Sequence, residues 1–391
     1  MKRLISLLLI IAFAVSLSAY SELYSNEIVG ELNSPLTAYS AGTGSVMFMS
    51  NPIVNPSLKR VSDGYYISGG FGGLQYRETR SRYLFDSYDN NIGKTTTYDN
   101  SYFYGEPFYI TAFIPVSSFG INLGFANLYS QDYDYEKTYR DNNYVTLYQE
   151  KIANTGSINA YFLSASYSIW HITIGGNLSI IQGDGEKTYS IVHVDPAMTD
   201  STHNIDEEYS SIKGGFSIAY EPAERFNATA FYHLPVNVKN QRSIDAAGSD
   251  TVSTADRHDG YIPTIAGFGI MYRPANIRPV TLLLEAVYER WTELNGPNSY
   301  DYSDIIKYHL GIKHQMGSNI EMMYGILYEP YRRYADYNHA ADAGITAGFN
   351  YTINDVVFSL AGQYVQNTYN IEDQYNTNRM IKMNTDIGIN F

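Results

Sequence analysis

The stretch from Arg379 to Phe391, RMIKMNTDIGINF, alternates between apolar and polar residues. Successive side chains in a β-strand point to opposite faces, so this stretch predicts a strand with one apolar and one polar face. A final strand that alternates and ends on an aromatic residue is typical of outer-membrane β-barrels, in which one face contacts lipid and the other faces a polar interior. The last strand of a soluble β-sandwich also alternates. The rest of the chain must therefore decide between these two folds.

Fourteen alternating stretches follow one another from Tyr65 onward. They span roughly 65–76, 105–115, 118–129, 147–168, 171–190, 209–220, 225–239, 258–273, 279–294, 305–316, 319–332, 340–352, 355–371 and 378–391. Six short turns alternate strictly with seven longer polar or tyrosine-rich connections near 77–104, 130–146, 191–208, 240–257, 295–304, 333–339 and 372–377. Outer-membrane barrels have short periplasmic turns and long outer loops. We therefore expect an all-β fold, a 14-stranded antiparallel transmembrane β-barrel over residues 65–391.

Charged residues set the inward face of the predicted strands 305–316 and 319–332. A lysine that faces lipid at the bilayer midplane costs about 2–4 kcal/mol. Lys307, Lys313, Glu321 and Lys382 should therefore face the interior. When the hairpin is continued through Gly317, Lys313 lies opposite Glu321. This register predicts an ion pair inside the barrel.

The first residues have the layout of a secretory signal peptide. Lys2 and Arg3 precede an apolar run from Leu4 to Val15, and small residues follow it. The run is shorter than the about 20 residues of a membrane-spanning helix. We expect a signal peptide over residues 1–19 and export to the outer membrane of a Gram-negative-type cell. The absence of cysteine excludes disulfides and a lipid-modified N-terminus.

Residues 20–64 lack sustained alternation and contain many turn-forming residues, which predicts irregular structure with a short helix at most. Irregular backbone cannot face lipid, because its N–H and C=O groups would stay unpaired. This segment must lie in the periplasm or inside the barrel. Its length suits an N-terminal hatch that plugs the lumen.

Composition and motifs argue against nucleic-acid binding and catalysis. The chain carries 26 Lys and Arg against 40 Asp and Glu, a formal charge of −14, whereas phosphate binding needs a basic face. The segment nearest to a Gly-x-Ser-x-Gly motif, Gly215–Ala219, lies inside a predicted strand instead of a strand-to-helix turn. The eight histidines are dispersed and there is no cysteine for a zinc site. We expect no enzyme activity, no metal and no cofactor.

Tyrosine is abundant, with 39 copies, and many lie in two stretches near residues 83–109 and 129–149. Tyrosine has a high strand propensity and suits boundaries that are apolar at one end and wet at the other. Both stretches are expected to be outer loops. Such loops are also candidate surfaces for adhesion or for an envelope protein partner.

Three stretches resemble the FadL/TodX family of outer-membrane transporters for long-chain fatty acids and other hydrophobic compounds. They are GTGSVMFMSNPIVNPSL (42–58), SSIKGGFSIAYEPAERFNATAFYHLPVNVK (210–239) and YIPTIAGFGIMYRPANIRPVTLLLEAVYERW (261–291). The first is similar to the Asn-Pro-Ala element of the family's hatch: Asn51-Pro52 matches, and Ile53 replaces the usual Ala. The resemblance implies a 14-stranded barrel with a plug that admits hydrophobic small molecules by passive, plug-gated diffusion.

The resemblance also leaves a different function open. The same superfamily includes barrels that act in protein secretion, so a secretion-machinery partner or a surface adhesin is the alternative. A general porin is a third hypothesis, and it would require the N-terminal segment to leave the lumen open. The expected partners are outer-membrane lipid and a hydrophobic ligand.

Several residues are candidates for ligand binding or gating: Asn51, Pro52, Lys213, Lys307, Lys313 and Glu321. The Asn-Pro pair is either a gate or simply a turn initiator. The inward lysines either attract a fatty carboxylate or pair with Glu285, Glu321 and Asp386 to hold plug and wall together. Glycines 69–73 either mark a strand kink that releases an apolar solute into lipid or serve packing in the first strand.

Overall fold

The computed structural model describes residues 37–58, 64–88, 90–130, 133–140, 144–246, 253–255, 260–275, 279–294, 302–330, 341–371 and 374–391. The predicted signal peptide (1–19) and part of the remaining N-terminal segment (20–36 and 59–63) lie outside these residues. No helix in the described part combines the length and the apolar character that a helical membrane span needs.

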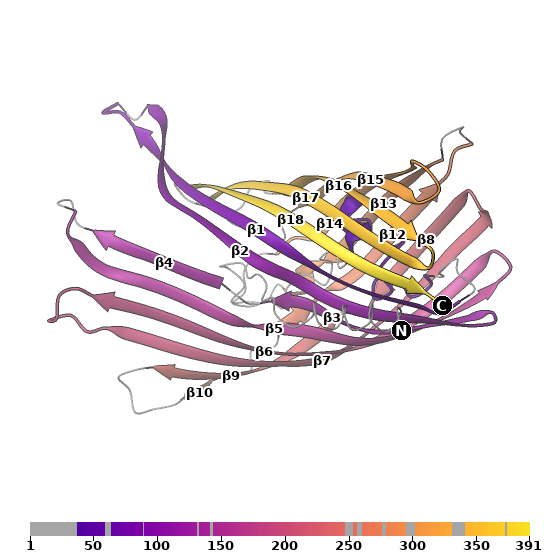
Figure 1. Ribbon diagram of the computed structural model, residues 1–391. Helices are drawn as coiled ribbons and strands as arrows, with labels where there is room; N and C mark the ends of the chain where they lie inside the picture. Colours follow the sequence, from indigo (N-terminus) through magenta and orange to yellow (C-terminus); the bar gives the residue numbers. More distant parts are fainter. Residues whose placement is uncertain are drawn as a thin grey trace.

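Antiparallel strands form a closed barrel with 14 positions in its wall (Figure 1). Eleven positions hold one strand each: β1 (Tyr66–Phe85), β2 (Asn91–Val116), β5 (Thr146–Ile169), β6 (Ile172–His193), β7 (Ser201–Ala223), β13 (Val280–Arg290), β14 (Ile305–Gln315), β15 (Ile320–Pro330), β16 (Ala341–Ile353), β17 (Val356–Ile371) and β18 (Gln374–Asn390). Three positions are interrupted, and they hold β3 (Phe119–Ser130) with β4 (Tyr133–Arg140), β8 (Phe226–His233) with β9 (Val236–Ala246), and β10 (Ser253–Ala255) and β11 (Gly260–Ile262) with β12 (Thr264–Tyr272). The pairing of β1 with β18 closes the barrel, so the predicted fold is confirmed.

Strand β6 shows how the two faces of the wall differ. Its exposed outward side chains are apolar: Ile172, Ile174, Leu178 and Ile180. Thr173, Ser179 and Ile181 alternate with them and are buried inside. An apolar exterior is what a lipid-facing wall requires. The inward lysines agree, because Lys213 and Lys307 are buried while Ile306 and Tyr308 are exposed outside.

Tight turns join the strands at one end of the barrel, here called the turn end. Ser117, Trp170 and Asn354 each occupy the first position of a two-residue turn and have φ values of 56°, 55° and 52°. Positive φ at this position matches the twist of a two-residue hairpin. The short turns predicted near 117, 170 and 354 are therefore present.

The opposite, loop end differs from the prediction. The stretch 77–104 was expected to be a loop, but β1 continues to Phe85 and β2 starts at Asn91. The expected loop 130–146 likewise contains β4, and the β1–β2 hairpin and the β4–β5–β6–β7 sheet extend far beyond the neighbouring strands (Figure 1). In this region outward side chains are polar, and pairs such as Arg77–Asp99, 2.6 Å apart, lie on the surface. Hydrophobic alternation therefore fails to mark these strands.

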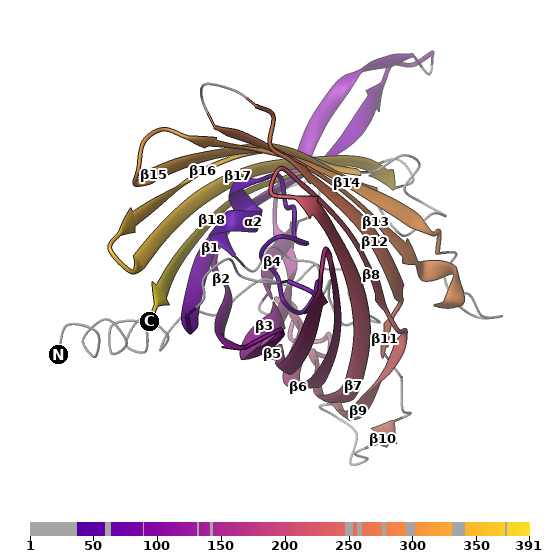
Figure 2. The same ribbon diagram turned by 90° about the vertical axis from the view of Figure 1, so that its right-hand side faces the viewer.

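Residues 37–58, here called the inner segment, lie inside the barrel (Figure 2). The segment begins with the short helix α2 (Ala38–Gly42), which contacts β15, β16, β17 and β18. It continues through turns to Leu58. Val46, Met47 and Phe48 are fully buried and form a core with inward residues of β8, β12 and β13. A 3-10 helix, η1 (Trp291–Leu294), follows β13 at the loop end.

Candidate functional site

The inner segment is held by carboxylates of the wall. Helix α2 starts at the N-cap Thr37, whose side chain accepts the N–H of Ser40 at 3.1 Å. Asp386 on β18 accepts the N–H of Ala38 at 2.5 Å, so a wall residue satisfies another free donor of the first turn. Glu285 on β13 accepts the N–H of Phe48 at 2.8 Å and also binds the N–H of Met47. These contacts join backbone to wall irrespective of the segment's side chains.

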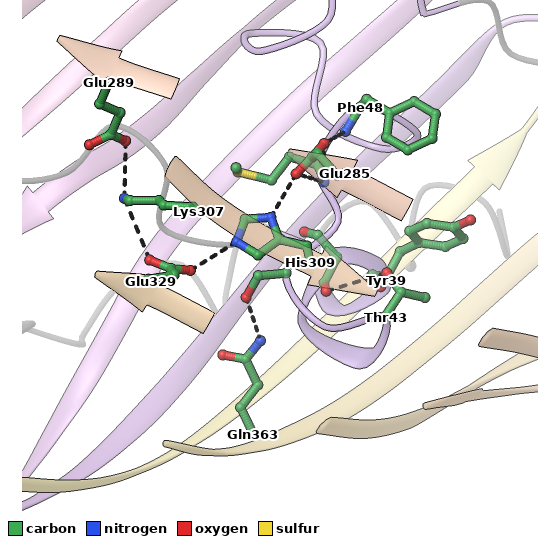
Figure 3. Close-up of polar contacts among 12 residues, drawn as sticks. Tyr39, Thr43, Phe48, Glu285, Glu289, Lys307, His309, Glu329 and Gln363 are labelled. Atoms are coloured by element: carbon green, nitrogen blue, oxygen red, sulfur yellow. Dashed lines mark hydrogen bonds and ion pairs between the residues drawn. The ribbon is translucent and has the colours of Figure 1, made fainter. Parts of the chain in front are cut away.

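Glu285 belongs to a buried chain of charged side chains on three adjacent strands (Figure 3). His309 on β14 places Nδ1 2.8 Å from Glu285 and Nε2 3.1 Å from Glu329 on β15. Lys307 lies 3.0 Å from Glu289 and 3.5 Å from Glu329. A neutral imidazole has one N–H, so satisfying both carboxylates requires a protonated ring or a protonated carboxyl group. The chain links the inner segment to the wall electrostatically.

The same chain reaches the loop end. Trp291 in η1 donates from Nε1 to Glu289 at 2.8 Å and stacks on Tyr302 with ring centroids 6.2 Å apart. Hydrogen bonds and ion pairs therefore run from Phe48 of the inner segment to η1. Within the described residues, no group of three or more His, Asp or Glu side chains is arranged to hold a metal ion.

Neutral side chains hold the C-terminal end of α2. The hydroxyl of Thr346 donates to Gly42 O and accepts from Gly44 N, each at 2.9 Å. The amide of Gln363, labelled at the bottom of Figure 3, donates to Ala41 O at 3.0 Å. The last carbonyls of the helix thus find partners on the wall.

Glycines of the wall let the inner segment approach closely. A Cβ atom on Gly325 of β15 would lie 2.2 Å from Gly44 N, and one on Gly175 of β6 would lie 2.3 Å from the carbonyl carbon of Pro56. No side chain fits at either contact without movement of the backbone. The described part of the inner segment is therefore packed directly against the wall.

The Asn51-Pro52 pair forms a turn next to a small pocket. Asn51 Oδ1 accepts the N–H of Ile53 at 2.9 Å and contacts that of Val54 at 3.3 Å. The pocket is small: the centre of a water molecule could occupy a volume of about 10 Å³ inside it. It is lined by Thr37, Asn51, Pro52, Ile53, Tyr109, Thr111, Ala126 and Phe162. The sequence-predicted Asn51 and Pro52 thus share a cavity with the wall.

A cluster of buried apolar side chains, here called the apolar inner surface, lies on the inside of the wall next to this pocket. It consists of Ile53, Tyr109, Ala126, Leu128, Ile158, Ala160, Phe162, Ile181, Tyr209, Val238 and Ile262. All except Ile53 come from strands β2 to β11. A water-filled barrel has a polar interior, so a continuous apolar inner surface is unusual for a porin.

The predicted charged residues face inward, but their pairing differs in part. Lys313 and Glu321 form the expected ion pair at 2.8 Å. Their register is nevertheless wrong, because Gln315, not Lys313, lies opposite Glu321. The turn is centred on Ser318 instead of Gly317, and the pair spans a diagonal. The Lys313 ammonium also lies 4.7 Å from the centroid of the Tyr39 ring on α2.

Two of the carboxylates that were expected to pair with the lysines bind the inner segment. Glu285 binds its backbone and His309, and Asp386 binds the N–H of Ala38. Lys307 pairs with Glu289 and Glu329, which were not predicted. Lys213 is buried on β7, and no carboxylate of the described residues lies within the 4.0 Å of an ion pair. The sequence signal for the missed His309 was its place two residues from Lys307 on the inward face.

Gly70 has a packing role in the first strand. Its Cα partner on β18 is Asp386, and a Cβ on Gly70 would lie 2.0 Å from Asp386 Oδ1. The glycine therefore leaves room for the carboxylate that caps α2. The register of β1 against β2 also shifts between Gly70 and Gly72, so the wall is irregular there.

The fold is similar to solved structures of hydrophobic-compound channels. A FadL homologue from Pseudomonas aeruginosa is 11% identical with a TM-score of 0.60, and the match covers 91% of this chain and 98% of that one. The toluene transporter TodX from Pseudomonas putida is 13% identical with a TM-score of 0.60, covering 95% and 100%. The toluene transporter TbuX from Ralstonia pickettii is 12% identical with a TM-score of 0.59, covering 94% and 100%. No protein-family model and no curated protein sequence matches the chain. At these identities the shared property is the fold.

Proposed function

We propose, from a barrel fold shared with FadL-type channels and an apolar inner surface, that this protein is an outer-membrane channel. It takes up hydrophobic small molecules, such as long-chain fatty acids or aromatic compounds, by passive diffusion. The apolar inner surface around Ile158, Phe162 and Ile181 is the observation that carries the proposal. Each apolar side chain there favours an apolar solute over water by burying its surface.

The inner segment acts as the gate in this proposal. Signal-peptide cleavage after about residue 19 leaves residues 20–64 as a hatch and residues 65–391 as the barrel. The close contacts at Gly325 and Gly175 leave no space between the wall and the described part of the segment at these two places. A solute therefore passes only when the segment shifts, and the charged chain through Glu285 sets the free energy of that shift. This arrangement supports the transporter over a general porin.

Two wall features are proposed to act on the solute. Lys213 is the inward cation best placed to attract an anionic head group, since it is buried without a carboxylate at ion-pair distance in the described part of the chain. The irregular pairing near Gly70 and Gly72 is a candidate exit toward lipid. Lys307, Lys313 and Glu321 are instead proposed to hold segment and wall together.

Uptake by cells tests the function. Cells that lack other uptake routes for hydrophobic compounds would produce the wild type, Ile181→Asn or Ser179→Asn, and entry of a labelled apolar compound would be measured. Both side chains are buried on the inward face of β6, and one belongs to the apolar surface. We expect uptake by the wild type and the Ser179 control and reduced uptake by the Ile181 variant. Uptake by the wild type no faster than by cells with an empty vector would overturn the proposal.

A surface-contact role is the second candidate, because the tip of the β1–β2 hairpin exposes apolar side chains. Leu84, Phe85, Tyr88 and Ile92 are all exposed at this tip. Asp86 orders the tip by accepting the N–H groups of Tyr88 at 2.8 Å and Asn90 at 2.9 Å. Loss of cell adhesion on replacing these apolar residues with serine, with uptake unchanged, would favour this role.

A further inference from the structure

Two arginines, here called the arginine pair, face each other on the outside of the wall where the first and last strands meet. Arg77 on β1 and Arg379 on β18 are direct cross-strand partners, and both are exposed. Tyr76 and Met380, their neighbours in the sequence, are buried inside, so alternation directs both guanidinium groups outward. Like charges directly opposite each other on one sheet face are destabilising. The arginine pair is therefore unfavourable unless an anion lies beside it.

One carboxylate lies nearby, and it engages one of the two arginines. Asp99 on β2 accepts hydrogen bonds from Arg77 through both oxygens, at 3.0 Å and 2.6 Å, and one from Thr79 at 3.2 Å. Arg379 has no carboxylate within the 4.0 Å of an ion pair in the part of the chain that the structure describes. The side chains of Arg77 and Asp99 are 52% and 41% exposed, so a ligand can reach them. The site thus keeps an uncompensated positive charge in a protein whose formal charge is −14.

The arginine pair lies at the upper edge of the lipid-facing band. On β18 the next outward residues toward the turn end are Ile381 and Met383, and both are exposed. Twelve residues separate Arg379 from Phe391 at the turn end. At about 3.3 Å per residue and a strand tilt of about 40°, they span about 30 Å along the barrel axis, slightly more than the apolar band of about 25 Å. The pair is therefore level with lipid head groups on the loop-end side of the membrane.

The neighbouring outward residues at this level are uncharged. Strands β17, β18, β1 and β2 lie next to one another in the wall (Figure 1). The row that contains the arginine pair continues with Gln366 on β17 and Ser101 on β2, which are both exposed. Tyr364 lies closer to the turn end on the same face and donates its hydroxyl to Gln366 at 3.1 Å. The patch thus presents apolar and aromatic groups toward the bilayer interior and two cations at its edge.

We propose that the arginine pair binds an anionic lipid of the outer leaflet. Its head-group phosphate lies between Arg77 and Arg379, and its acyl chains lie along Ile381 and Met383. Guanidinium groups match the geometry of phosphate oxygens and bind them through paired N–H donors. A lipid supplies both the anion and the apolar body that this patch requires, whereas a free anion supplies only the first. The inference goes beyond uptake of solutes and needs only the membrane location of the barrel.

Fluorescence quenching by labelled lipids tests the site. Because the chain has no cysteine, Gln366→Cys places a single fluorophore directly opposite Arg379 on the outer surface. The purified full-length protein is reconstituted in phosphatidylcholine vesicles that contain either spin-labelled phosphatidic acid or spin-labelled phosphatidylcholine, each labelled on the acyl chain near the head group. The two quenching curves give the relative affinity of this position for the anionic lipid. We expect a roughly five- to thirtyfold preference for phosphatidic acid, the range for one or two arginines near an anionic lipid.

Three variants, each carrying the fluorophore, separate lipid binding from a purely structural role. Arg379→Gln removes the arginine that has no ion pair, and the preference should fall roughly fivefold, the contribution of one arginine. Asp99→Asn removes the carboxylate that competes for Arg77, so the preference should rise above that of the wild-type site. A role limited to joining β1 and β2 predicts no such rise. Arg290→Gln, which removes an exposed arginine of β13 from an ion pair with Glu293, is the matched control and should leave the preference unchanged.

The possible outcomes distinguish this inference from the proposed uptake. Equal affinities for the two lipids, or an unchanged preference in Arg379→Gln, would overturn the inference and leave the uptake proposal standing. An equal fall in Arg290→Gln would show a general effect of surface charge and overturn it as well. A preference that did not rise in Asp99→Asn would overturn the placement of the phosphate at Arg77. Absence of quenching by both lipids would place the pair away from the bilayer edge, with the same result.

Inorganic phosphate distinguishes a lipid from a free anion. Added at constant ionic strength in exchange for chloride, it should leave the preference for phosphatidic acid intact, because it lacks the acyl chains that contact Ile381 and Met383. Loss of the preference would show that the arginine pair binds phosphate groups irrespective of an apolar body. That result would overturn the assignment to a lipid.

Discussion

Glu285 in the wall accepts the backbone N–H of Phe48 at 2.8 Å, across 237 positions of the chain. The same carboxylate binds His309 at 2.8 Å and is fully buried. A hydrogen bond to a charged group contributes about 1.5–3 kcal/mol. This contact should therefore contribute substantially to the free energy that holds the inner segment in place.

Neutralising Glu285 should loosen the inner segment. In Glu285→Gln the charge is lost, and Val46, which is fully buried, should be reached by solvent more often. Because the chain has no cysteine, Val46→Cys provides a clean labelling reporter. We expect labelling about ten- to a hundredfold faster, from the energy of the lost charged bonds. Glu207→Gln, which breaks the Lys187–Glu207 pair elsewhere on the wall, is the control and should not change the rate.

Removing Lys307 should destabilise the whole barrel. Glu289 and Glu329 would stay buried without their shared cation. Breaking a buried ion pair from one side costs about 3–5 kcal/mol. Urea unfolding of Lys307→Met in lipid vesicles, followed by tryptophan fluorescence, should show this loss. Lys151→Met at an exposed outward site should change stability by less than about 0.5 kcal/mol, and equal effects of both variants would contradict the assignment.

A methyl group at Gly325 should displace the inner segment. Its Cβ would meet Gly44 N at 2.2 Å, and backbone on both sides prevents simple rearrangement. We expect Gly325→Ala to raise Val46→Cys labelling while the barrel still forms. Gly317→Ala, where a Cβ meets no atom within 4 Å, should behave as the wild type. Unchanged labelling in the Gly325 variant would mean that the segment lies elsewhere.

Acid should loosen the tip of the β1–β2 hairpin. The side-chain amide of Asn90, with the N–H groups of Asn90 and Tyr88, holds the pKa of Asp86 below its usual value. A lowered folded-state pKa stabilises the tip above the unfolded pKa, and the effect is lost as pH falls through the folded value. NMR titration of Asp86 should show this lowered pKa, and Asn90→Ala should raise it. Titration at the model-peptide value in the wild type would contradict the ordered tip.

Sequence patterning predicted the barrel because every strand in contact with lipid must place apolar side chains on its outward face. The tight turns near 117, 170 and 354, the 14 wall positions and the inward lysines all followed from this requirement. The extended hairpins were missed because polar outward side chains, such as Arg77 and Asp99, remove the alternation. Strand pairing there depends on backbone hydrogen bonds, which any polar sequence can form.

The details of the site were less predictable. The Lys313–Glu321 pair was correct although the register was two residues off, because long side chains reach diagonal neighbours. The role of Glu285 was missed since its main partners are backbone N–H groups, which leave no mark in a sequence. That Asn51 Nδ2 has no hydrogen-bond partner among the described residues likewise depends on packing and not on local pattern.

Asp386 on the last strand caps α2 near the start of the described chain, and Gly70 on the first strand makes room for it. The cap of α2 therefore lies directly beside the seam at which β1 pairs with β18. A larger side chain at position 70 would displace the Asp386 carboxylate from Ala38, so a single change on the first strand would disturb the seam of the barrel and the seat of the inner segment together.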